Sequence, residues 1–220
     1  PGPTTRTGDP LANHLHIGDL PEGLTFGASI AVDTETAGLH PIRDRLCVVQ
    51  LSAGDGDAHL VHFPRPAEGG RPDYSAPRLR KLLADRDVEK IFHFARFDLA
   101  VMQRDLGLHA LPVFCTKIAS KLVRTYTDRH GLRDICQELL GVSISKEQQS
   151  SDWGAATLSD AQVAYAAADV LHLHALRERL AEMLEREGRM PLAAASFAYL
   201  PTRAALDLAG WDSVDIFAHA

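Results

Sequence analysis

The stretch "SIAVDTETAGLHPIRDRLCVVQLS", residues 29–52, decides the fold. An apolar run that is typical of a buried strand ends on two carboxylates, Asp33 and Glu35. Residues i and i+2 of a strand point to the same face, so both acids are aimed at one place. Like charges at that separation repel, so the pair must share a proton, lie in open water or hold a cation. A second apolar run, residues 46–52, predicts a neighbouring strand.

Outward from this stretch, strand and helix patterns alternate. Strands are expected at 26–35, 46–52 and 59–63, which predicts an antiparallel meander. Short apolar runs and helical spacings then alternate, and Ser159 with Gln162 has the spacing of a capping box that opens one long helix ending at Gly188. This order predicts an α/β domain built on a mixed sheet. We expect an N-terminal leader at 1–24, the domain at 25–188 and a C-terminal segment at 189–220 that serves as an oligomerisation element.

Composition limits the functional classes. A chain of 220 residues with 45% hydrophobic and 24% charged residues is typical of one globular domain, and we expect no membrane partner. The net charge of −6 disfavours a protein that grips long nucleic acid through an extensive basic face. Residues 1–21 lack the apolar core of a signal peptide, so we expect a cytoplasmic protein. Three widely spaced cysteines among apolar residues favour reduced, buried thiols.

Two further acids and a tyrosine extend the first pair. Asp98 lies in the first turn of an expected helix, and Tyr165 and Asp169 share a helical face through their i, i+4 spacing. Each feature alone has an ordinary explanation, such as a solvated turn residue or an acid that complements a helix dipole. Together they form a set of hard oxygen ligands, which favours Mg²⁺ or Mn²⁺ over zinc.

The motifs "DTETAGL", "HFARFDLA" and "QVAYAAADVLHLHAL" occur in the order that is found in the DEDD superfamily of 3′–5′ exonucleases. The chain resembles the tyrosine-bearing subgroup that includes ribonuclease D, over about residues 25 to 185. Ribonuclease D tends to have Arg-Pro where this chain has Ala156-Thr157, and its helical HRDC domains have no room within these 220 residues. The length and the C-terminal sequence instead resemble the compact bacterial nano-RNases of the NrnC type.

This resemblance implies a ribonuclease H-like fold, a mixed sheet flanked by helices as in DnaQ-like exonucleases, and a site for two divalent cations, Mg²⁺ or Mn²⁺. Asp33 would bridge both cations. Glu35 and Asp169 would complete the site of the cation that activates water, and Asp98 would hold the second cation. Tyr165 would orient the attacking water, because a phenol with a pKa near ~10 is a poor base at neutral pH.

For substrate binding, the resemblance places Leu39 against a base and the backbone near Thr36 on the terminal ribose. Other candidates are a basic cluster at 124–133 that could cap a 5′ phosphate, and residues near the first two motifs. The full set of candidate substrate-binding residues is Thr36, Gly38, Leu39, His93, Arg96, Arg133 and Lys146. Leu39 could equally be an ordinary core residue beside a turn, His93 a structural histidine, and the basic cluster a solvated face.

The function that follows is a metal-dependent 3′–5′ exoribonuclease that degrades very short single-stranded RNA, down to dinucleotides, to nucleoside 5′-monophosphates. We expect it to act as a homo-oligomer, on the nano-RNase resemblance an octamer. One alternative is a ribonuclease D-like exonuclease for longer RNA, or one that also accepts DNA. Another is a nuclease-fold protein that binds RNA without catalysis. The retention of all four carboxylates and Tyr165 counts against the last alternative.

Overall fold

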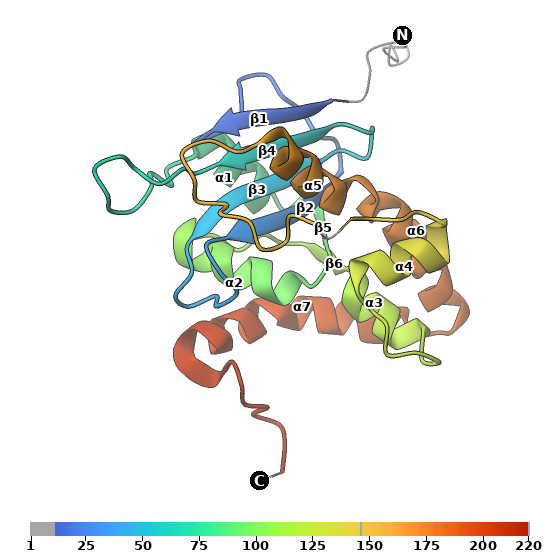
Figure 1. Cartoon of the computed structure of the whole chain (residues 1–220). Coiled ribbons are helices and arrows are strands. Elements are labelled where there is room, and N and C mark those ends of the chain that lie inside the picture. Colours follow the sequence, from blue (N-terminus) through green and yellow to red (C-terminus); the bar gives the residue numbers. More distant parts are fainter. Residues whose placement is uncertain (1–11, 146, 220) are drawn as a thin grey trace.

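The computed structural model describes residues 12–145 and 147–219 and contains a six-stranded sheet with helices on both faces (Figure 1). The strand order is β1-β4-β3-β2-β5-β6. Strands β2, β3 and β4 pair antiparallel, whereas β1 pairs with β4, β5 with β2 and β6 with β5 in parallel. The strands are β1 Asn13–Ile17, β2 Ser29–Thr36, β3 Leu46–Ser52, β4 Ala58–His62, β5 Glu89–Phe92 and β6 Val113–Cys115. The mixed α/β sheet expected from the sequence is confirmed.

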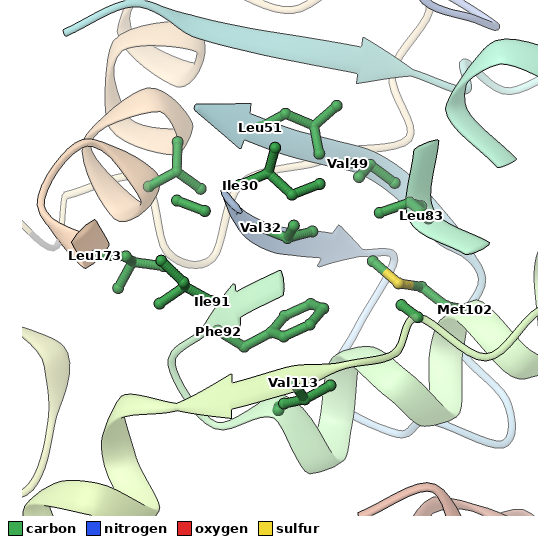
Figure 2. Packing of buried hydrophobic residues seen from close by; sticks show 14 of the residues in the cluster. Ile30, Val32, Val49, Leu51, Leu83, Ile91, Phe92, Met102, Val113 and Leu173 are labelled. Carbon is green, nitrogen blue, oxygen red and sulfur yellow. The ribbon is translucent and has the colours of Figure 1, made fainter. Parts of the chain in front are cut away.

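Helices follow the opening meander and continue to the C-terminal region. Helix α5 crosses strands β1 to β4 on one face of the sheet, while α1 and α2 pack on the other (Figure 1). The close-up of the core shows Leu83 of α1 beside Val49 of β3 (Figure 2). The helices are α1 Pro77–Ala84, α2 Ala95–Asp105, α3 Thr116–Val123, α4 Leu132–Leu140, α5 Asp160–Leu171, α6 Leu173–Arg186 and α7 Met190–Leu206, followed by the short η1 Asp207–Trp211.

The register of the central strands separates an apolar face from the face that carries the acids. Asp33 of β2 lies opposite Gln50 of β3, and Val32 lies opposite Leu51 in the next row. Because successive side chains alternate between faces, Asp33 points toward the α5 side and Val32 toward the α1 side. Val32 and Leu51 are fully buried, whereas Asp33 is half-buried. The sheet thus fixes the first two carboxylates on one face.

The expectation of a leader over residues 1–24 is wrong for its second half. Residues 13–17 form β1, which extends the sheet as a parallel partner of β4, and Leu20 is buried in the core. The more buried positions of this strand are His14 and His16, while Leu15 and Ile17 are exposed. An inward-facing row of histidines does not have the apolar alternation that predicts a strand, which explains the error. Residues 1–11 lie outside the described part of the chain.

The single helix expected from Ser159 to Gly188 is also wrong, because it is two helices, α5 and α6, that meet at His172. The capping box of Ser159 and Gln162 is present as expected. His172 has φ −109° and ψ −2°, which changes the direction of the chain. Helix α5 packs across the β1–β4 side of the sheet, whereas α6 packs on α3, α4 and β5. One straight helix could not follow both surfaces.

The C-terminal segment divides into a packed helix and an exposed end. Helix α7 packs on α2 and β6 and buries Phe197, Leu200 and Ala204 in the core. After η1 the chain extends away from the body of the domain, and Trp211 and Phe217 are 46% and 75% exposed (Figure 1). Residues 190–206 therefore contribute to the domain's own core, and most of the exposed apolar side chains of the segment lie beyond them.

Candidate active site

Three of the four predicted carboxylates converge where β2 passes beneath α5. Asp33 and Glu35 come from the same face of β2, and Asp169 comes from α5, which packs on that face. One carboxylate oxygen from each lies within 4.8 Å of those of the other two. Tyr165, one turn before Asp169, lines the same pocket, whose volume is about 330 Å³. The structure therefore brings together acids that are more than 130 positions apart in the chain.

Asp98 occupies a separate position beside this group. It lies in the first turn of α2 with 3% of its surface exposed, and its Oδ1 accepts a hydrogen bond of 2.7 Å from Thr34 Oγ1. Burial raises the pKa of Asp98 well above its usual value, and repulsion from Asp33 raises it further. Asp98 is thus close enough to interact electrostatically with the site, but Thr34 holds its carboxylate. Sequence reasoning missed Thr34, whose only signal was its place between Asp33 and Glu35.

The three carboxylates repel one another, and a bound cation would offset this repulsion. Burial raises the pKa of Asp33, Glu35 and Asp169, and the pKa of Glu35 rises further through repulsion from the other acids. The neutral amide of Gln50 donates to Asp33 Oδ2 at 3.1 Å. No lysine or arginine within residues 12–145 and 147–219 forms an ion pair with any of the three. A hard divalent cation fits this donor set because it would neutralise the repulsion with oxygen ligands.

Tyr165 is set up to donate a hydrogen bond. Burial raises the pKa of its phenol above the ordinary value, and the neighbouring charges of Asp169, Glu35 and Asp33 raise it further. The ring packs 6.0 Å from that of Trp153, which is buried. A phenol in this setting stays protonated at neutral pH, which agrees with an orienting role and not with that of a base.

The loop after β2 forms one wall of the pocket. Leu39 is 89% exposed and lines the opening, so it is not a core residue beside a turn. Thr36 also lines the pocket, and its hydroxyl donates to the carbonyl of Gly38. A Cβ on Gly38 would collide with the carboxylate of Asp44, which accepts a hydrogen bond from the backbone N–H of His40. Any larger residue would therefore displace the Asp44 carboxylate and break its hydrogen bond to His40.

The opposite wall comes from the start of α2 and from α3. His93 Nδ1 lies 2.9 Å from Thr116 Oγ1, and burial lowers the pKa of His93 to about 3, so its ring is neutral. Phe94 has φ 67°, a left-handed conformation that is rare for a non-glycine residue and is associated with functional sites. Lys117 Nζ lies 4.3 Å from the centre of the Phe94 ring. Sequence reasoning missed Phe94 and Lys117, because neither belongs to a motif with a chemical signature.

Arg96 and two arginines of the basic cluster do not line the pocket. Arg96 points away from the pocket and forms an ion pair with Asp207, with Nε 2.6 Å from Oδ2. The prediction that Arg96 binds substrate is therefore wrong. In the basic cluster, Arg124 is buried against Glu138, and Arg129 pairs with Asp134.

Other members of the predicted substrate-binding set remain near the pocket or cannot be placed. Arg133 lines the pocket, together with Ser145 and Gln149, which sequence reasoning missed. Lys146 lies outside the described residues. The basic residues that face the site are therefore Lys117 and Arg133, among those that the structure describes.

Comparison with known proteins agrees with this geometry. Residues 18–185 match a family described as 3′–5′ exonuclease. The chain belongs to this 3′–5′ exonuclease family. Ribonuclease D from Gluconacetobacter diazotrophicus is 37% identical over 171 residues, which cover 78% of this chain and 42% of that protein. The chain thus spans about two fifths of the length of this relative.

Solved structures show the same relationship in three dimensions. Brucella melitensis NrnC bound to pGG is 56% identical, with a TM-score of 0.89, over 96% of this chain and 100% of that one. A structure of the same NrnC with bound Mg²⁺ has a TM-score of 0.85 at 55% identity, over 94% of this chain and 98% of that one. Escherichia coli RNase D has a TM-score of 0.68 at 28% identity, over 80% and 45% of the two chains. The predicted resemblance to ribonuclease D and the NrnC-type nucleases is confirmed, as is the exonuclease fold.

The pH dependence of stability tests the repulsion among the carboxylates. Burial raises the pKa of Asp169 to about 8, above the ordinary value near ~3.9, so between these limits the folded state holds a proton that the unfolded state releases. Stability without metal must therefore fall as pH rises from about 4 to about 8. Asp169→Asn removes this loss, so in EDTA we expect its urea midpoint to exceed that of the wild type near pH 8 and to match it near pH 5.

The matched control is Asp128→Asn, which changes an exposed carboxylate and should leave the midpoint unchanged at both pH values. Adding Mg²⁺ at pH 8 should stabilise the wild type more than Asp169→Asn, because the wild type keeps all three ligands. A variant that is equally destabilised at both pH values would contradict the assignment of Asp169 to a charged, repelling cluster.

Proposed function

We propose that the protein is a metal-dependent 3′–5′ exoribonuclease that degrades very short RNA, down to dinucleotides, to nucleoside 5′-monophosphates. The observation that carries the proposal is the convergence of Asp33, Glu35 and Asp169 with Tyr165 in one pocket. Membership of the 3′–5′ exonuclease family and the 56% identity to an NrnC that was solved with pGG support it. A binding protein without catalysis would have no need for three half-buried, mutually repelling acids.

The residues present fit divalent cations, Mg²⁺ or Mn²⁺, and the related NrnC was solved with Mg²⁺. Asp33, Glu35 and Asp169 would hold one cation, and Asp98, which lies beside them, would join Asp33 in holding a second. When bound, two such cations supply an activated water and stabilise charge on the phosphate and on the leaving oxygen.

The chain's own groups position the reactants. The protonated phenol of Tyr165 donates a hydrogen bond that orients the attacking water on the scissile phosphate. Leu39, exposed at the pocket opening, packs on a base, and the backbone around Thr36 and Gly38 faces the terminal ribose. The neutral ring of His93 donates from Nδ1 to Thr116, whose hydroxyl donates to the Phe92 carbonyl, so Nε2 of His93 can accept a hydrogen bond from substrate in this wall of the pocket.

The preference for short RNA rests on the size and charge of the site. The pocket holds about 330 Å³, at the low end for small-molecule sites. Lys117 and Arg133 face it, enough to meet a terminal phosphate but not to follow a long strand. The net charge of −6 leaves no overall basic surplus for a longer track.

Two further parts of the proposal concern assembly and location. We propose a homo-octamer whose contacts involve the exposed apolar side chains at the C-terminal end, which include Trp211, Val214 and Phe217. We also propose a cytoplasmic location, which the three free and buried cysteines support. Within the described residues, no helix has the length and hydrophobicity needed to cross a membrane.

A competition between substrates tests the length preference. Equal concentrations of a 5′-phosphorylated dinucleotide and a longer RNA or DNA oligomer of the same sequence, incubated with Mg²⁺, should show the dinucleotide consumed first with 5′-monophosphates as products. EDTA or Asp33→Asn should abolish turnover, because either removes the cation or one of its ligands. If the longer RNA disappears first and dinucleotides accumulate, the ribonuclease D-like alternative replaces this proposal.

The orienting role of Tyr165 makes a separate prediction. Tyr165→Phe keeps the ring and its packing on Trp153 but removes the hydroxyl. We expect kcat to fall by about 10²-fold while KM for the dinucleotide stays nearly constant, since a misplaced nucleophile affects the reaction and not binding. Steady-state kinetics separate the two constants. Equal losses in kcat and in affinity would assign the hydroxyl to substrate binding instead.

The assembly prediction is tested in solution. Light scattering at micromolar concentration should give about eight times the chain mass of 24.0 kDa. Replacing both Trp211 and Phe217 with serine should shift the mass to smaller species, because it removes exposed apolar surface without touching the core. Leu192→Ser, which alters a 61% exposed residue at the other end of α7, is the matched control. A monomer mass for the wild type would refute the proposal.

A further inference from the structure

Three histidines form a stack at the N-terminal edge of the sheet. His14 and His16 come from β1, and His59 comes from β4, where it pairs in register with His14. The His59 ring lies 4.6 Å from that of His14 and 5.4 Å from that of His16, with planes inclined by 14° and 10°. Phe26, which is buried, closes one side with its ring 5.5 Å from His59 at 78°. The proposed exonuclease reaction uses none of these side chains.

Two ring nitrogens in this stack already face each other. His16 Nε2 and His59 Nδ1 are 3.1 Å apart. Such a pair either shares a proton in an N–H···N hydrogen bond or binds one cation. Two zinc–nitrogen bonds of about 2.0–2.1 Å at a tetrahedral angle place their nitrogens about 3.3 Å apart. The observed separation is close to this value, so a tilt of the two rings would bring both nitrogens onto one ion.

From this geometry we propose that His14, His16 and His59 form a binding site for a borderline transition-metal ion such as Zn²⁺. His16 Nε2 and His59 Nδ1 supply the first two ligands. His14, whose side chain is 41% exposed, supplies the third through Nδ1 after a change in ring tilt that keeps Nε2 beside Asp57, and water fills the remaining position. No proton is released overall, because a neutral imidazole moves its proton to the nitrogen that does not bind the metal.

The surroundings of the stack suit neutral imidazole ligands. Burial and, to a smaller extent, the neighbouring histidines lower the pKa of His59 to about 4. Burial likewise lowers the pKa of His16. Asp57 Oδ2 lies 3.6 Å from His14 Nε2, and its Oδ1 accepts a hydrogen bond of 2.9 Å from the Ala12 backbone. A carboxylate on the outer nitrogen of a ligating histidine is the usual support for such a ligand.

The sheet keeps this site apart from the catalytic carboxylates. The register joins His14 and His59 to Leu51 and Val32, and joins Asp33 to Gln50 in the alternate row. The histidines therefore lie on the face opposite the acids. The donor sets also differ, because imidazole favours Zn²⁺, Co²⁺ and Ni²⁺ whereas carboxylate oxygens favour Mg²⁺. One chain can thus hold two kinds of metal without competition.

A bound ion would join the edge strand to the sheet. Strand β1 has β4 as its only pairing partner among the described strands, and its outer edge is unpaired. A metal held by two side chains of β1 and one of β4 would cross-link them in the folded state only, which stabilises that state. The site is accordingly a structural one, separate from the proposed reaction.

The experiment is a metal titration with millimolar Mg²⁺ present to occupy the carboxylates. Zn²⁺ is titrated by calorimetry, and Co²⁺ by its visible absorption. We expect one ion per chain with micromolar affinity, together with an upward shift of Tm on addition of Zn²⁺. His59→Gln and His16→Gln should each abolish both effects. His14→Gln should weaken binding, and Asp57→Asn should weaken it by about tenfold or more.

Two controls separate this site from the others. His109→Gln alters an exposed histidine elsewhere, and Asp169→Asn weakens the catalytic cluster, so both should bind Zn²⁺ as the wild type does. His59→Gln should keep the wild-type exonuclease rate with Mg²⁺, which also shows that it folds. The proposal is overturned if the wild type binds no Zn²⁺, if His59→Gln binds as tightly as the wild type, or if Asp169→Asn abolishes binding.

Discussion

Mutual repulsion of three half-buried carboxylates is the constraint on which the rest of this structure depends. Asp33 and Glu35 are forced together by the two-residue period of β2, and Asp169 is brought to them by α5. Burial makes their negative charge costly in the absence of a cation. The central part of the other face is apolar, with Val32 and Leu51 buried beneath α1, and this burial supplies the stability that such a cluster removes.

The same alternation explains how one small domain accommodates polar chemistry on two sides. Each strand presents every second residue to each face, so a row of acids and amides and a row of apolar residues can occupy the same strand pair. Toward the edge of the sheet the apolar row gives way to imidazoles at His14 and His59. The carboxylates and the histidines therefore lie on opposite faces, and the hydrogen-bonded backbone of the sheet separates them.

Sequence patterns predicted the parts of the fold whose causes are local. Strand β3 matches its predicted range of 46–52 because every residue in it is buried, and the Ser159 capping box is a short-range signal. No proline or glycine marks the turn at His172 in the sequence. The turn results from the different surfaces on which α5 and α6 pack. The convergence of three acids could be inferred through family resemblance, whereas Thr34, Phe94 and Lys117 act through contacts between distant segments.

Arg96 shows how a basic residue near a catalytic motif can mislead. It stands two positions before Asp98 on α2, yet its guanidinium binds Asp207, 111 residues away, together with the carbonyl of Asp212. The same Asp207 also receives Arg203, so this network fastens the end of the chain to the helix that carries an active-site acid. A loss of activity after mutation of Arg96 would therefore indicate that the C-terminal region is no longer anchored to α2. It would not show that Arg96 contacts a phosphate of the substrate.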